Sequence, residues 1–186
     1  MTAATVVVFD VNETLSDMTP MAGRFAEVGL PPHLAPTWFA SVLRDGFALA
    51  ATGTQASFAS IAEGVLRCLL ASTAPAGDAD DAVAHVLSGF TSLPLHPDVV
   101  PGVAALVGAG LRLVTLSNGA AWVAEALLTG AGIRTSFERL LSVEDAELWK
   151  PAAPSYAYAA RRCAVPLAVN VARAFELPNH GCSIVG

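Results

Sequence analysis

A short apolar run that ends on a carboxylate limits the folds open to this chain more than any other feature. Val6–Phe9 are apolar on successive positions, and Asp10 follows them at once. Successive apolar, β-branched residues are typical of a strand that is buried on both faces, as in a parallel sheet. The segment LRLVTLSNG at 111–119 has the same design and ends in polar residues. The two runs therefore predict two strands of a parallel sheet.

Segments with helical spacing flank the second run. PDVVPGVAALVGAG at 97–110 predicts a helix with proline in its first turn, and AAWVAEALLTGAG at 120–132 predicts a helix that a glycine ends. FERLLSVED at 137–145 predicts another strand, and APSYAYAARRCA at 153–164 predicts another helix. Strands that alternate with helices predict an α/β fold with a parallel sheet.

Residues 16–95 interrupt this alternation. Two long segments in this region, 35–53 and 54–72, have aromatic and aliphatic residues at helical spacing, and a third, 78–90, begins with acidic residues that favour a helix N-terminus. The sequence therefore predicts two domains. Residues 1–15 and 96–186 would form the α/β core domain, and residues 16–95 would form a helical insertion.

Composition restricts the class of protein. Of the 186 residues 54% are hydrophobic, enough to bury a core, and the net charge of −6 with no basic stretch argues against binding to nucleic acid. The N-terminus has no basic region, and no apolar run approaches the ~18 residues of a membrane span. We therefore expect a cytoplasmic protein with no membrane partner. Three widely spaced cysteines, with no CxxC pair, are expected to be buried free thiols: Cys68, Cys163 and Cys182.

Polar residues follow three of the predicted segments. Asp10, Ser117–Asn118 and Lys150 each come after an apolar or strand-like run. Because ligands bind at the carboxyl ends of the strands in open parallel sheets, we expect these residues to converge. Each has a structural alternative. Asp10 could cap the following turn, Ser117 could cap the next helix, and Lys150 could be a solvated surface charge.

Three segments together resemble the signature of the haloacid dehalogenase superfamily. They are FDVNETL at 9–15, LSNG at 116–119 and WKPAAPSY at 149–156. Within the superfamily the chain is most similar to the type II L-2-haloacid dehalogenases, which share the LSNG turn, an Arg in a cap helix and a Tyr six residues beyond the Lys. The resemblance covers residues 5–165. It implies a Rossmann-like parallel sheet core with an inserted helical cap domain.

The resemblance also implies a hydrolase with an aspartate nucleophile. Asp10 would attack C2 of a short 2-halocarboxylic acid and expel the halide, and water would hydrolyse the resulting ester to give the 2-hydroxy acid. Lys150 would keep Asp10 ionised by charge pairing, and Thr14 would orient Asp10 or the attacking water. Arg44 would bind the departing halide or help to hold the substrate anion, unless it is only a surface charge on an amphipathic helix.

Other residues would bind the substrate. Ser117 and Asn118 would bind its carboxylate through backbone N–H groups at a helix start. Tyr156 would donate a hydrogen bond near Lys150, or else belong to the core. Three aromatic residues of the insertion would line an apolar pocket for the halogen, or else pack in the core: Trp38, Phe39 and Phe58.

The phosphatases of the superfamily are the alternative activity. They usually carry a second Asp two residues after the nucleophile, where this chain has Asn12, and they hold Mg²⁺ with an Asp downstream of the Lys. After Lys150 the only carboxylate side chain is Glu176. The sequence therefore favours dehalogenation, which needs no metal or other cofactor. Glu13 departs from the family pattern, because the family usually has Gly at this tight turn.

The resemblance ends in the C-terminal segment. LAVNVA at 167–172 predicts a further strand, but the polar stretch and supporting Asp of the family do not follow it. The sequence therefore predicts a C-terminus that is altered or truncated after residue 165. A catalytically impaired protein is accordingly a further alternative. Members of the family often form dimers, so a homodimer is also expected.

Overall fold

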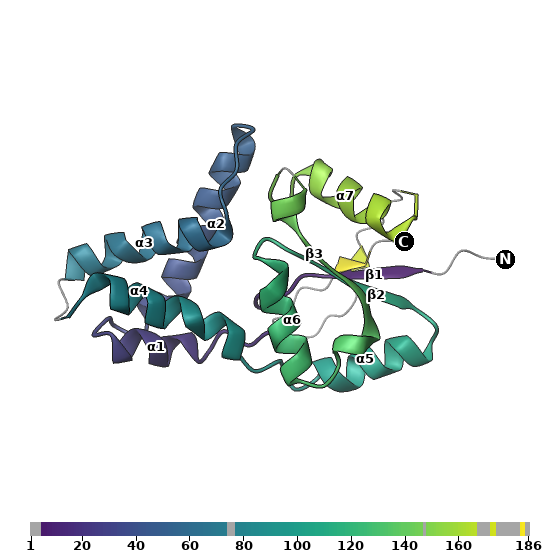
Figure 1. Cartoon of the computed structure of the whole chain (residues 1–186), viewed down its shortest axis with the longest axis horizontal. Coiled ribbons are helices and arrows are strands. Elements are labelled where there is room, and N and C mark those ends of the chain that lie inside the picture. The colour runs from purple at the N-terminus through teal and green to yellow at the C-terminus, as the bar shows by residue number, and fades with distance from the viewer. Residues whose placement is uncertain (1–4, 74–76, 147, 167–171, 174–182, 185–186) are drawn as a thin grey trace. The chain divides into compact units, whose positions relative to one another are not determined.

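The computed structural model describes residues 5–73, 77–146, 148–166, 172–173 and 183–184 (Figure 1). The chain divides into two compact units. We call Met1–Asp17 with Pro94–Gly186 the core unit, and Met18–Leu93 the helical unit. The assignment of domains with separate roles to these units stays a prediction.

The core unit is built on a five-stranded sheet with the strand order β3-β2-β1-β5-β4. The strands are β1 Val6–Phe9, β2 Arg112–Ser117, β3 Phe137–Ser142, β4 Ala172–Arg173 and β5 Ser183–Ile184. β1, β2 and β3 pair in parallel, as the sequence predicts, whereas β5 pairs antiparallel with both β1 and β4. Most of the strand predicted at 167–172 lies outside the described residues.

Helices lie against both faces of this sheet (Figure 1). They are α5 Val99–Gly108, α6 Ala121–Gly130 and α7 Ala153–Cys163. α5 and α6 share one buried cluster with β1, β2 and β3, which includes Val7, Phe9, Val99, Val103, Leu113, Leu128 and Phe137. Successive side chains of a strand point to opposite faces, so Val6 and Val8 face the other side, where they meet α7. Both faces of the first strand are therefore covered, as its apolar sequence requires.

The third strand is shorter than the sequence predicts. β3 ends at Ser142, and Val143–Asp145 form a 3₁₀ turn. The Ser142 hydroxyl accepts a hydrogen bond from the Glu144 N–H at 3.0 Å and so stabilises this turn. A serine that bonds to the backbone two residues on competes with the strand ladder, which accounts for the early end.

The helical unit is a bundle with an aromatic core. Its helices are α1 Met21–Glu27, α2 Leu34–Ala51, α3 Phe58–Thr73, α4 Ala79–Ser88 and a 3₁₀ turn, Gly89–Ser92. Five aromatic rings form a row in which neighbouring ring centroids lie between 5.3 and 6.2 Å apart. In spatial order they are Phe25, Trp38, Phe90, Phe58 and Phe39. Asp78 caps α4 by accepting the N–H groups of Asp80 and Asp81.

The two cysteines that the structure describes differ in exposure. Cys163 is buried, as expected, but Cys68 is exposed, so that expectation is wrong for Cys68. Leu66 and Leu70 hold the buried face of α3, and a residue two positions from either points away from it. Cys182 lies outside the described residues.

None of the described helices has both the length and the apolar composition of a membrane span.

The turn after β1 adopts the backbone conformation that the family pattern assigns to glycine. Glu13 has φ of 60°, in the left-handed region, which costs a residue with a Cβ about 1–2 kcal/mol. Glycine avoids this strain but loses about 0.5–1 kcal/mol of chain entropy on folding. We therefore expect Glu13→Gly to raise the free energy of unfolding by about 0.5–1 kcal/mol, measured from the urea midpoint at unchanged slope.

A matched variant shows whether the gain belongs to this turn. Glu125 lies in the middle of α6, where glycine is expected to cost about 1 kcal/mol. Glu125→Gly should therefore lower the free energy of unfolding. If Glu13→Gly destabilised the protein as much as Glu125→Gly does, the strain at position 13 would be refuted.

Candidate active site

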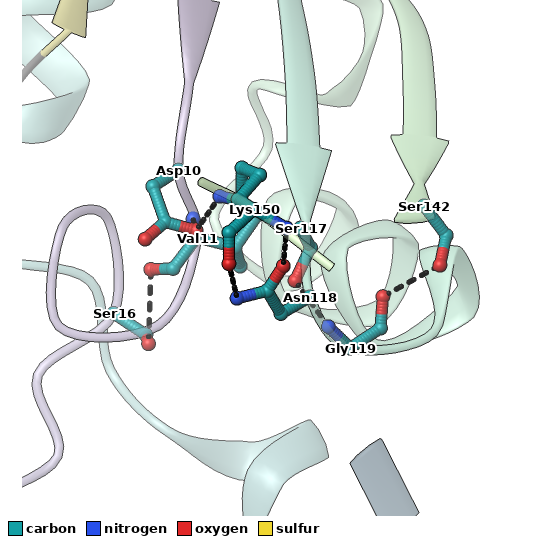
Figure 2. Close-up of polar contacts among 8 residues, drawn as sticks. All are labelled: Asp10, Val11, Ser16, Ser117, Asn118, Gly119, Ser142 and Lys150. Atoms are coloured by element: carbon teal, nitrogen blue, oxygen red, sulfur yellow. Dashed lines mark hydrogen bonds and ion pairs between the residues drawn. The ribbon is translucent and has the colours of Figure 1, made fainter. Parts of the chain in front are cut away.

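The site begins where three parallel strands end. Asp10 follows β1, Ser117 is the last residue of β2, and Ser142 is the last residue of β3. Ser117 and Ser142 are register partners in the parallel ladder. Because parallel strands end at the same edge of the sheet, their polar side chains gather there, as Figure 2 shows.

The centre of this edge is an ion pair between Asp10 and Lys150. The Lys150 ammonium donates to Asp10 Oδ1 at 2.7 Å, and the Val11 N–H donates to the same oxygen at 2.8 Å (Figure 2). The Lys150 side chain is only 13% exposed, whereas the Asp10 side chain is 46% exposed. The interpretation of Lys150 as a solvated surface charge is therefore wrong. The carboxylate is held by a charge and remains open to a small molecule.

The backbone of Lys150 is fixed by Asn118. Asn118 Oδ1 accepts the Lys150 N–H at 2.9 Å, and Asn118 Nδ2 donates to the Lys150 carbonyl at 3.5 Å (Figure 2). Buried Trp149 precedes the lysine, and α7 begins three residues after it. The Ser155 hydroxyl donates to the Leu148 carbonyl at 2.5 Å and closes this loop. The lysine therefore projects from a loop that is tied at both ends.

The turn after β2 is held by two serines. Ser117 Oγ accepts the Gly119 N–H at 2.9 Å, and Ser142 Oγ donates to the Gly119 carbonyl at 2.9 Å. α6 has Ala120 at its N-cap with no side-chain bond, so the interpretation of Ser117 as the cap of that helix is wrong. Ser142 was not among the residues that the sequence singled out, although a serine at the end of a parallel strand is the signal that marks Ser117.

Tyr156 and Thr14 lie on elements next to the ion pair. Tyr156 is on α7, and burial first, then the negative charge of Asp10, raises the pKa of its phenol. The hydroxyl therefore keeps its proton and can donate a hydrogen bond. Thr14 lies in the turn after β1, where its N–H donates to the Val11 carbonyl at 3.3 Å. The catalytic role of Thr14 stays a prediction.

The remaining candidates belong to the helical unit. Arg44 lies on α2 with its side chain 70% exposed, and it forms an ion pair with Asp45 at 2.7 Å. The hydrogen bond to Asp45, then its charge, raises the pKa of the Arg44 guanidinium. Arg44 and the ion pair belong to different units, so a part for Arg44 in the site stays a prediction.

Packing accounts for the three aromatic candidates. Trp38 is completely buried, and its indole N–H donates to the Ala62 carbonyl at 3.0 Å. Phe39 and Phe58 are buried in the same aromatic core. Of the two interpretations that the sequence left open, the structure therefore supports core packing. Within the described ranges, no three His, Cys, Asp or Glu side chains group as metal ligands would.

Comparison with known proteins agrees with this geometry. A family model of haloacid dehalogenase-like hydrolases matches residues 4–172. An (S)-2-haloacid dehalogenase of Pseudomonas putida is 26% identical over 162 residues, which is 86% of this chain and 71% of that protein. An (S)-2-haloacid dehalogenase of Xanthobacter autotrophicus is 29% identical over 153 residues, which is 81% of this chain but only 59% of that protein.

Solved structures show the same fold. An L-2-haloacid dehalogenase from Xanthobacter autotrophicus superposes with a TM-score of 0.78 at 28% identity, over 89% of this chain and 67% of that one. A second structure of an enzyme with that name, with chloropropionic acid covalently bound, gives a TM-score of 0.77 at 28% identity, over the same shares of the two chains. The predicted α/β fold with its parallel sheet is confirmed, and the chain belongs to the haloacid dehalogenase-like hydrolases.

Proposed function

We propose that this protein is an (S)-2-haloacid dehalogenase, which converts a short 2-halocarboxylic acid and water into the 2-hydroxy acid, halide and a proton. The observation that carries the proposal is the carboxylate of Asp10, paired with Lys150 at 2.7 Å yet 46% exposed. The names of the relatives support the same reaction.

The first step is displacement at carbon. A carboxylate oxygen of Asp10 attacks C2 of the substrate, a bond forms between that oxygen and C2, and the halide leaves with the electron pair of its bond. Two donors among the described contacts, the Lys150 ammonium and the Val11 N–H, hold Oδ1, so we assign the attack to Oδ2. A halide leaves without a proton, so this step needs no acid at position 12, where the chain has Asn12.

The second step is hydrolysis of the ester on Asp10. Water attacks the side-chain carbonyl carbon, and negative charge collects on Oδ1. The Lys150 ammonium and the Val11 N–H already lie 2.7 and 2.8 Å from that oxygen. They therefore form an oxyanion hole that is in place before the reaction. The bond to the 2-hydroxy acid then breaks, its oxygen takes a proton from the attacking water, and Asp10 is regenerated.

Substrate binding is assigned to groups of the core unit and to one arginine of the helical unit. Ser117 and Asn118 lie just before the N-terminus of α6, where backbone N–H groups and the helix dipole favour a carboxylate. Tyr156 supplies a hydroxyl donor, Arg44 receives the halide, and Thr14 orients the attacking water. The reaction balances without a cofactor. A homodimer and a cytoplasmic location remain predictions of the sequence.

Incubation with L-2-chloropropionate in EDTA tests the proposal. We expect chloride and D-lactate in equal amounts, since displacement inverts C2, and little turnover of D-2-chloropropionate. Chloride is measured by ion chromatography and lactate by a stereospecific assay. Release of phosphate from phosphate esters that requires Mg²⁺, with no release of chloride, would instead establish the phosphatase alternative.

A further inference from the structure

Asn118 contacts Lys150 through both ends of its carboxamide. Its oxygen accepts the Lys150 N–H at 2.9 Å, and its nitrogen donates to the Lys150 carbonyl at 3.5 Å. The two residues are 32 positions apart in the chain, so these bonds join the end of β2 to the loop before α7. Figure 2 shows Asn118 beneath the lysine, with both bonds directed at the lysine backbone.

We propose that the side chain of Asn118 is a positioning residue, which fixes the backbone of Lys150 so that the ammonium stays on Oδ1 of Asp10. The proposal rests on the proposed function for its kinetic consequences, but its geometric claim holds for the protein at rest. It assigns to the Asn118 side chain a role separate from the substrate binding that its backbone N–H is expected to perform.

The physical need for such a contact comes from the lysine itself. A lysine side chain is a flexible four-carbon stem, and holding its ammonium in one place costs about 2 kcal/mol of rotamer entropy. Burial of the stem restricts part of this freedom, since Lys150 is 13% exposed. Where the ammonium lies also depends on the position of the Lys150 backbone. Asn118 fixes that position through the N–H and the carbonyl on the two sides of the Lys150 Cα.

Asn118 is itself held in place by the neighbouring turn. Gly119 follows Asn118, and its N–H and carbonyl are bonded to Ser117 and Ser142 at 2.9 Å each. Ser117 and Ser142 are both buried. The position of Asn118 is therefore set by β2 and β3, and through Asn118 these strands set the position of Lys150. These contacts connect the ends of two strands, β2 and β3, to one charged group.

Amine labelling tests the geometric claim without any need for activity. Lys150 is the only lysine of the chain, so an N-hydroxysuccinimide ester can modify one side chain, and peptide mass spectrometry separates this product from the labelled N-terminus. We expect Asn118→Ala to raise the labelling rate of Lys150 about tenfold, because two hydrogen bonds that hold the loop are lost. Glu125→Gln, at an exposed ion pair of α6, should leave that rate unchanged.

Kinetics test whether Asn118 acts through Lys150. Asn118→Ala should lower kcat by roughly 10- to 100-fold with little change in KM, because the ammonium is displaced from Oδ1. In a Lys150→Met background the same substitution should lower kcat less than twofold, since its target is gone. A side chain that bound the substrate directly would raise KM in both backgrounds.

These outcomes distinguish the positioning role of Asn118 from the proposed dehalogenase function. Faster labelling in Asn118→Ala, with a kinetic effect that vanishes in Lys150→Met, supports the positioning role. Wild-type labelling, or an undiminished effect in Lys150→Met, overturns it. If the wild-type protein released no chloride, the proposed function would fail while the labelling result still decided the geometric claim. Should Asn118→Ala not fold, Asn118→Asp keeps the acceptor for the Lys150 N–H and loses the donor. It should still label faster than the wild type, and a wild-type rate would again overturn the role.

Discussion

Asp10→Asn is expected to lower kcat with L-2-chloropropionate by at least roughly 10⁴-fold, because removal of a covalent nucleophile eliminates the reaction path itself. An amide has no negative charge with which to displace halide from carbon. The Asp10 side chain is 46% exposed, so the substitution leaves the packed core intact and the fold should persist. Single-turnover chloride release, with circular dichroism to confirm folding, measures the effect.

A second aspartate provides the matched control for this loss. Asp98 is exposed, precedes α5 and makes no side-chain cap bond with that helix. Asp98→Asn makes the same chemical change in the same unit, and it should alter kcat less than twofold. If Asp10→Asn kept more than a tenth of the wild-type activity, Asp10 would not be the nucleophile. If the wild type itself showed no turnover, the catalytically impaired alternative would apply.

The second large effect is expected at Lys150. Lys150→Met keeps an apolar stem of similar length but removes the ammonium that donates to Asp10 Oδ1. Among the described contacts this ammonium is the only cation on that oxygen. We expect kcat to fall by roughly 10³-fold, since loss of one preorganised donor at a developing oxyanion typically costs 10²–10³. The loss should appear in kcat more than in KM, because the interaction strengthens as charge collects on the oxygen.

Two further variants define what Lys150 contributes. Lys150→Arg keeps the charge, but a planar guanidinium does not fit where a compact ammonium lies 2.7 Å from Oδ1, so little activity should return. Arg161→Met removes an exposed cation from α7 and should leave kcat unchanged. A Lys150→Met enzyme within threefold of the wild type would show that the ion pair is structural.

The sequence predicts the framework of this protein because its strands and helices follow from local patterns. The apolar runs at β1 and β2 and the helical spacing of α5, α6 and α7 depend on neighbours in the chain. The convergence of Asp10 and Lys150 also follows, since parallel strands end at one edge. Local periodicity and sheet topology were sufficient for these parts.

Other features depend on partners that are distant in the sequence. The bonds between Asn118 and Lys150 cross 32 positions, and the bond from Ser142 to Gly119 crosses 23. No spacing rule predicts which side chain meets which backbone group across such a gap. The antiparallel pairing of β5 with β1 is equally non-local. The roles of Thr14 and Arg44 remain predictions, because they depend on where the substrate and water lie.

The central claim is that an ester forms on Asp10, and a single turnover in H₂¹⁸O tests it most directly. With enzyme in excess over L-2-chloropropionate, the lactate should carry the unlabelled oxygen of Asp10, and mass spectrometry should find ¹⁸O in the peptide that contains Asp10. Lactate that carried ¹⁸O from this first turnover, with an unlabelled Asp10, would show that water attacks C2 directly and would contradict the account.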